Sequence, residues 1–153
     1  MSASLGLFRL QQVDRQIDRA QSQLDIIRKT LENDVALRDA MERVDKAQKD
    51  HHNSRHNLQL IESEAENQQI KIQQAESSLY GGSVHNPKEL QDLQKDIESL
   101  KRHLDTLEER ELQALEQAEE AEKCLLKART DLEDIQFQLG DQNRKLLDDQ
   151  VAL

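Results

Sequence analysis

The sequence predicts an all-α protein that folds as a long antiparallel two-helix coiled-coil hairpin. Three observations support this prediction: few residues are apolar, apolar residues recur at heptad spacing, and turn-forming residues gather at one place near the middle. Of the 153 residues, 35% are hydrophobic and 34% are charged, whereas globular domains are about 45–50% apolar. This composition can fill a narrow seam between helices but not a compact core, so it disfavours an enzyme with a pocket.

The first helix is expected at about residues 4–79, with its apolar residues in two heptad blocks. The first block consists of Leu10, Val13, Ile17, Ala20, Leu24, Ile27 and Leu31. The second consists of Leu37, Ala40, Val44, Ala47, His51, Ser54, Leu58, Ile61, Ala65, Gln68, Ile72, Ala75 and Leu79. The two blocks are out of phase by one residue. We therefore expect a local change of winding near Asn33 and Asp34 that re-aims the first block at the seam.

A turn is expected at residues 80–86, which contain two of the four glycines and are followed directly by the only proline. A glycine after Tyr80 can adopt the left-handed conformation that ends a helix. Asn86 can cap the next helix, with Pro87 at its first position and Glu89 reaching back toward the cap. The residues assigned to the turn and the helix cap are Gly81, Gly82, Asn86, Pro87 and Glu89.

The second helix is expected at about residues 87–150, with an uninterrupted heptad pattern from Leu90 to Leu153. Counting outward from the turn pairs Leu79 with Leu90 and continues in layers to Leu37 with Leu132. The middle layers contain small residues and should bury less area than those near the turn. Beyond the phase shift, the expected layers are Leu31 with Leu139, Leu24 with Leu146, and Ile17 near Leu153.

This register gives no partner to the apolar start of the first helix. Unpartnered apolar surface usually marks a contact. A continuation of the chain, another subunit or a frayed terminus would each account for it. The residues concerned are Leu5, Leu7, Phe8, Leu10 and Val13.

The stretch LYGGSVHNPKELQDLQKDIESLKRHLDTLEE at residues 79–109 resembles a bacterial family of coiled-coil hairpin proteins that carry a C-terminal zinc ribbon with four cysteines. The N-terminal run that includes Leu10, Val13 and Ile17 is similar to the opening of that family. The resemblance is strongest at Leu79, Tyr80, Gly82, Val84, Asn86, Pro87, Lys88, Glu89, Leu90, Leu93, Gln94, Ile97 and Leu100.

The resemblance implies a hairpin over the whole chain, with possible nucleic-acid binding through the ribbon and links to secretion systems or alternative sigma factors. This chain contains one cysteine, Cys124, and therefore cannot form that ribbon. We expect a truncated or fragmentary member of the family, in which residues 1–153 form a single coiled-coil hairpin.

Charge disfavours direct nucleic-acid binding by the hairpin itself. The net charge is −10, and no basic stripe of single sign is visible in the sequence. Basic residues between Arg38 and Arg55 alternate with acidic ones and lie opposite the acidic stretch from Glu108 to Glu122. We expect this region to form interhelical charge pairs that help to set the register.

Neither a metal site nor a catalytic site is expected, and no cofactor is predicted. His52 and His56 share a helical face, but two ligands are too few, while His51 is expected to fill space in the seam. The abundant carboxylates are typical of helix surfaces, and a two-helix structure offers no cavity to exclude water. Cys124 is expected to pack passively beside Leu125.

The turn is the best candidate for binding a protein partner, because loops on rigid supports often carry function. Its candidate contact residues are Tyr80, Ser83, Val84, His85 and Asn86. No apolar run approaches the roughly 20 residues of a membrane span, and the single cysteine suits a reducing, cytoplasmic compartment.

We therefore expect a non-enzymatic coiled-coil interaction or adaptor protein, with homo-oligomers possible through the same heptads. The alternatives are a nucleic-acid-associated protein whose zinc ribbon is missing here and a clamp-like chaperone that holds clients between its arms.

Overall fold

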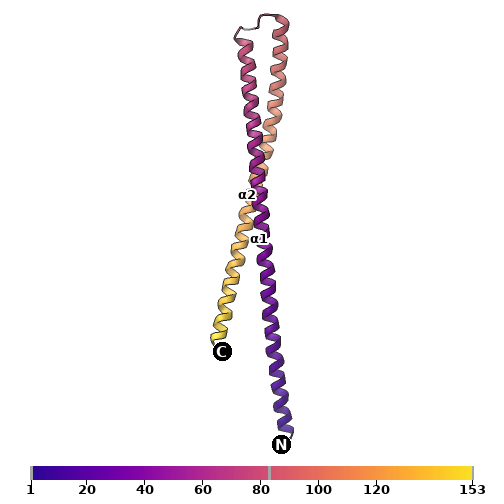
Figure 1. Cartoon of the computed structure of the whole chain (residues 1–153), viewed down its shortest axis with the longest axis vertical. Coiled ribbons are helices and arrows are strands. Elements are labelled where there is room, and N and C mark those ends of the chain that lie inside the picture. Colours follow the sequence, from indigo (N-terminus) through magenta and orange to yellow (C-terminus); the bar gives the residue numbers. More distant parts are fainter. Residues whose placement is uncertain (1, 83, 153) are drawn as a thin grey trace. The chain divides into compact units, whose positions relative to one another are not determined.

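Two long α-helices make up the hairpin. The computed structural model describes residues 2–82 and 84–152. Helix α1 (Ser2–Tyr80) and helix α2 (Pro87–Ala152) run antiparallel and are joined by a short turn (Figure 1). The predicted fold class, an all-α hairpin of two packed helices, is confirmed.

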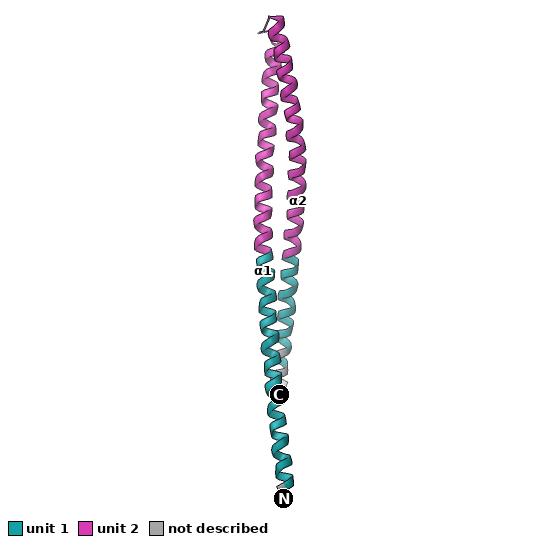
Figure 2. Cartoon of the chain, turned by 90° about the vertical axis from the view of Figure 1, so that its right-hand side faces the viewer, with its two compact units in different colours: residues 1–43, 129–153 teal, residues 44–128 magenta. Residues whose placement is uncertain are grey.

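The hairpin divides into two compact units (Figure 2). Unit 2 contains residues 44–128 and therefore includes the turn. Unit 1 contains residues 1–43 and 129–153, which are the two outer parts of the helices. The two units bury their apolar residues to different extents, so each is described separately.

In unit 2, every seam position that the heptads predict is buried or half-buried. This holds at 44–79 on α1 and at 90–128 on α2. Gln68 is the buried polar residue of this seam, and its side-chain Nε2 donates a hydrogen bond of 2.9 Å to the carbonyl oxygen of Leu100. Counting outward from the turn places Gln68 opposite Leu100, so this contact confirms the predicted register. The buried apolar residues are Ala65, Ile72, Ile97, Leu107, Ala114, Ala118 and Leu125.

In unit 1, the seam continues only a short way. Leu37, Leu132 and Leu139 are half-buried, and Ala40 is buried. Along α1, half-burial then ends at Asn33, and all described side chains at 3–32 are exposed.

We predicted that α1 changes its winding near Asn33 and Asp34 and so directs the first heptad block toward α2. This prediction is wrong. Leu31 and Leu24 are 60% and 61% exposed, so they form no buried layers with α2, and Ile17 is exposed too. The side chains of Leu146 and Leu153, their expected partners, lie outside the described residues. Helix α1 continues without interruption through Asn33 and Asp34. Because each residue turns the helix by about 100°, an uncorrected slip of one residue directs the first block away from α2.

The polar contacts between the helices also differ from expectation. No ion pair joins the stretch from Arg38 to Arg55 with α2 in the part of the chain that the structure describes. The interhelical ion pair in unit 2 instead joins Lys101 Nζ to Glu76 Oε1 at 2.9 Å. The hydrogen bond that Lys101 donates to Glu76, together with the negative charge of that carboxylate, raises the pKa of Lys101 above its ordinary value of 10.5. The pair lies near the turn, at the end of the hairpin where the predicted seam layers are largest.

Candidate functional site

The turn begins where two glycines follow the last residue of α1. The backbone N–H of Gly81 donates a hydrogen bond of 2.8 Å to the carbonyl oxygen of Ser77, which continues the helical pattern by one residue. Gly82 then has a φ of 73°, the left-handed conformation that L side chains rarely adopt. This conformation ends the helix and releases the chain into the turn.

Asn86 starts the second helix. Its side-chain Oδ1 accepts a hydrogen bond of 3.0 Å from the backbone N–H of Lys88, and its carbonyl oxygen accepts one of 2.9 Å from Leu90 N–H. These contacts give Asn86 the position of an N-cap, with Pro87 as the first helical residue. Glu89 lies in the first turn of α2, where its negative charge is favourable to the helix dipole.

The candidate contact residues at the turn differ in exposure. Tyr80 is 82% exposed, the largest value among the exposed large hydrophobic residues of the described chain. His85 and Asn86 are exposed, whereas Val84 is half-buried and contributes to packing of the turn. Ser83 lies outside the described residues. The turn therefore presents an exposed phenol and an exposed imidazole, which suit contact with a protein.

A second exposed surface lies on α1 in unit 1, and sequence reasoning did not predict its direction. We call it the apolar stripe and define it as the first heptad block. All of its side chains are exposed, although the spacing is that of a coiled-coil seam. The one-residue phase shift between the two heptad blocks indicated that the first block differs in direction. The shift alone does not determine whether the helix changes its winding to bury the first block or leaves that block facing away from α2. The stripe contains Leu10, Val13, Ile17, Ala20, Leu24, Ile27 and Leu31.

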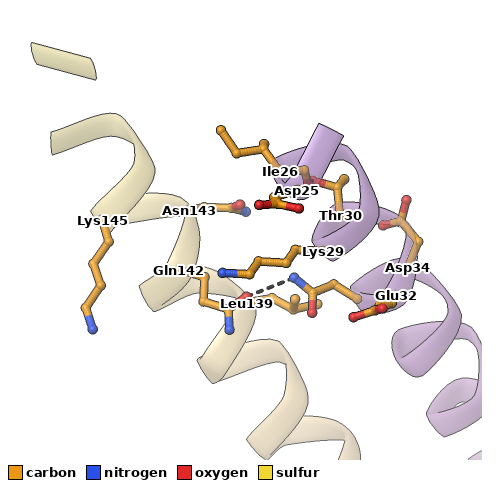
Figure 3. Close-up of a pocket in the computed structure, with 11 residues that line it drawn as sticks. Asp25, Ile26, Lys29, Thr30, Glu32, Asp34, Leu139, Gln142, Asn143 and Lys145 are labelled. Carbon is orange, nitrogen blue, oxygen red and sulfur yellow. Dashed lines mark hydrogen bonds between the residues drawn. The ribbon is translucent and has the colours of Figure 1, made fainter. Parts of the chain in front are cut away.

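A polar groove separates the two helices beside this stripe, with a volume of about 560 Å³ (Figure 3). On α1 it is lined by Ile26, Thr30 and Asn33, which extend the spacing of the buried seam from Leu37. In agreement, Ile26 is only 45% exposed, less than the neighbouring Leu24 and Ile27 of the stripe. The face of α1 that looks toward α2 in this region is therefore mostly polar.

Across the groove, Asn33 Nδ2 donates a hydrogen bond of 2.8 Å to Gln142 Oε1. The side chain of Lys29 reaches toward Gln142, while Lys145 points away from the groove (Figure 3). The groove is open and lined by side chains of both charges, so it lacks the apolar enclosure of a typical ligand pocket.

The histidine cluster does not gather further ligands. His51 is half-buried in the seam as predicted, and His52 and His56 are exposed. Within residues 2–82 and 84–152, no group of three or more His, Cys, Asp or Glu side chains could hold a metal ion.

Cys124, expected to pack passively, is exposed instead, with its thiol directed at Glu120 Oε1 at 3.9 Å. As for membranes, neither helix contains, over its described length, an apolar segment long enough for a crossing.

Comparison with known proteins adds one finding to this geometry. A family model described as the CT398-like coiled coil hairpin domain matches residues 10–152. The matched region includes the apolar stripe, the turn and all of α2. No significant match is found among curated proteins or among solved structures. The family match agrees with the hairpin part of the resemblance seen in the sequence and specifies no function.

Proposed function

Because the chain belongs to the CT398-like coiled coil hairpin family, we propose that it is a non-enzymatic adaptor that binds a protein partner through its turn. The observation that carries this proposal is the exposure of Tyr80 at 82% beside a turn whose backbone is fixed on both sides. A tyrosine offers a large contact area and a hydroxyl group, and two rotatable bonds keep its ordering cost low.

Rigid support of the turn favours binding, because less conformational entropy is lost when a partner docks. The Gly81 hydrogen bond to Ser77 closes the end of α1, and the Asn86 cap closes the start of α2. Val84, between these two hydrogen-bonded ends, is half-buried. Tyr80 and His85 are thus displayed from a framework that is already ordered.

Exposure of described side chains at the turn favours recognition of a partner over catalysis. Catalytic groups generally need burial or close charge partners that shift their pKa values. Among the described side chains of the turn, Tyr80 and His85 are exposed to solvent and not enclosed. The turn is therefore suited to recognition, and a reducing, cytoplasmic setting remains a prediction from the cysteine content.

The adaptor role can be tested by recovery of partners from a lysate of the organism that makes the protein. Wild-type chain, Tyr80→Ala and Val84→Ser would be immobilised and the recovered proteins compared. We expect Tyr80→Ala to lose at least one partner, since most of its side chain is free for contact. Phe137→Ala is the matched control, because Phe137 is also a highly exposed aromatic residue but lies on α2 in unit 1.

Helicity measured by circular dichroism would show that each variant is folded. Equal recovery of every partner by wild type, Tyr80→Ala and Val84→Ser would remove the turn as a binding site. Loss of a partner with Phe137→Ala but not with Tyr80→Ala would move the site to unit 1.

Links to secretion or transcription machinery, and nucleic-acid binding through a zinc ribbon, rest on the sequence resemblance. The charge of −10 works against RNA binding by this chain, because phosphates are held by clustered cations. Salt-dependent RNA binding by the chain would favour the nucleic-acid alternative. Suppression of client aggregation would favour the clamp-like chaperone.

A further inference from the structure

We propose that the apolar stripe of α1 binds the same stripe of a second copy of the chain as a short antiparallel coiled coil. This surface lies in unit 1, whereas the proposed adaptor site lies in unit 2. Self-association is therefore an additional property of the molecule and does not depend on the partner of the turn.

The spacing of the stripe selects a helix as its occupant. Its residues alternate steps of three and four over roughly three heptads, and such a narrow repeat forms the seam of a coiled coil. Within one chain this seam has no described helix against it, because α2 faces a different set of positions, occupied by Ile26, Thr30 and Asn33. Exposures of 48–61% at Leu10, Val13, Ile17, Leu24, Ile27 and Leu31 leave the surface free.

The charges that flank the stripe are complementary to those of a second antiparallel copy. When two copies of this heptad run antiparallel, the edge that carries Asp14, Gln21 and Arg28 meets the same edge of the other copy. Counting along the heptads places Asp14 opposite Arg28 of the second copy, and Gln21 opposite its own equivalent. The attractive pair occurs twice by symmetry, and no like charges meet on this edge.

Two copies of the chain repel each other because both are acidic, but this segment does not share the acidic charge. Residues 9–31 contain five basic and three acidic side chains, a net charge of +2, whereas the whole chain carries −10. An approach of two copies through this segment is therefore less opposed by charge than an approach through any strongly acidic face.

Side-chain size favours the antiparallel direction. In the register that the Asp14–Arg28 pairs require, Val13 meets Leu31, Ile17 meets Ile27, and Ala20 meets Leu24 of the second copy, so the small alanine faces a large side chain. A parallel pair would instead stack alanine on alanine at Ala20.

The first test measures oligomeric state by sedimentation equilibrium from micromolar to near-millimolar concentration. We expect a monomer–dimer equilibrium for wild type and a dimer weakened about 100-fold or more by Leu24→Asp, since two buried leucines are lost per dimer. Leu60→Asp is the matched control, because Leu60 is also an exposed leucine of α1 but lies in unit 2. A wild-type monomer throughout, or a dimer that Leu24→Asp leaves intact, would overturn the proposal.

A charge exchange tests the same contact with little change in packing. Asp14→Arg should weaken the dimer about tenfold, because it places like charges together twice. Adding Arg28→Asp should restore the affinity to within about twofold by re-forming both pairs in reverse. A double variant as weak as Asp14→Arg alone would contradict the antiparallel pairing of these edges.

Crosslinking determines the direction of the two helices. In a Cys124→Ser background, which removes the exposed native thiol, Gln21→Cys should crosslink to its equivalent through a short bismaleimide. Leu31→Cys should crosslink only weakly, because antiparallel pairing places it opposite Val13. The reverse pattern would show a parallel pair and overturn the proposed arrangement. Tyr80→Ala should leave the association unchanged in every assay, which separates this surface from the adaptor site.

Discussion

At the turn, Gly81 and Gly82 are needed for different physical reasons. Gly82 has a φ of 73°, so a side chain there would strain the backbone although the space around it is open. Gly81 has no such φ, but a Cβ atom at this position would approach the Ser77 carbonyl oxygen to 2.6 Å. The first glycine allows a close backbone contact, and the second allows the left-handed residue that follows it.

Alanine substitutions should separate these effects from ordinary helix propensity. Gly82→Ala should lower the free energy of unfolding by about 1 kcal/mol or more, and Gly81→Ala should also be destabilising. Gly140→Ala is the control, since Gly140 lies inside α2 with nothing within 4 Å of an added Cβ, and it should stabilise by about 0.5–1 kcal/mol. Urea unfolding followed by circular dichroism measures all three. A stabilising Gly82→Ala would contradict the role assigned to its φ.

At the scale of elements, Gln68 is a polar group within the apolar seam of α1 and α2. It is 5% exposed, and its side chain binds the Leu100 carbonyl oxygen, which ties one helix to the other at a defined level. Buried polar residues at seam positions commonly fix register at a cost in stability. The carbonyl of Leu100 lies within α2, so loss of the extra hydrogen bond leaves its helical one in place.

Gln68→Leu should therefore keep or raise stability, with a gain of up to about 1 kcal/mol, because an apolar side chain replaces a polar one in the seam. Gln68→Ala should destabilise by about 1–3 kcal/mol, because it leaves both a void and a missing contact. Gln69→Leu, one residue away and exposed, controls for the change of side chain alone and should have little effect. Strong destabilisation by Gln68→Leu would mean that the hydrogen bond outweighs the apolar gain.

The seam of unit 2 could be predicted from the sequence because each layer of the heptad pattern supports the same register. The turn signals at Gly82 and Asn86 then fixed which layers face each other. The direction of the apolar stripe could not be predicted, because a phase shift of one residue is compatible with rewinding or with turning away. The outcome depends on how the packed seam continues through Asn33, which is a property of both helices together. For the turn, half-burial of Val84 was likewise not visible in the local sequence.

At the scale of the molecule, the two units differ in what stabilises their helices. In unit 2, residues at each heptad step on both helices are buried or half-buried. In unit 1, burial of α1 against α2 ends at Asn33. On the N-terminal side of Asn33, the described side chains from 3 to 32 are exposed. Long helices without tertiary packing are only marginally stable in water, since most helical stability in proteins comes from a buried face.

Hydrogen exchange should reveal this difference and its dependence on concentration. In dilute protein, backbone amides at 10–31 should exchange about tenfold or more faster than those at 58–79, because local opening there exposes no packed seam. As concentration rises, pairing of the apolar stripe should slow exchange at 10–31 and leave 58–79 unchanged. Leu24→Asp should abolish the concentration dependence while retaining the fast exchange. Equal protection of both segments in dilute wild type would show that the start of α1 is stabilised within a single chain, and so would remove the reason for a second copy to cover it.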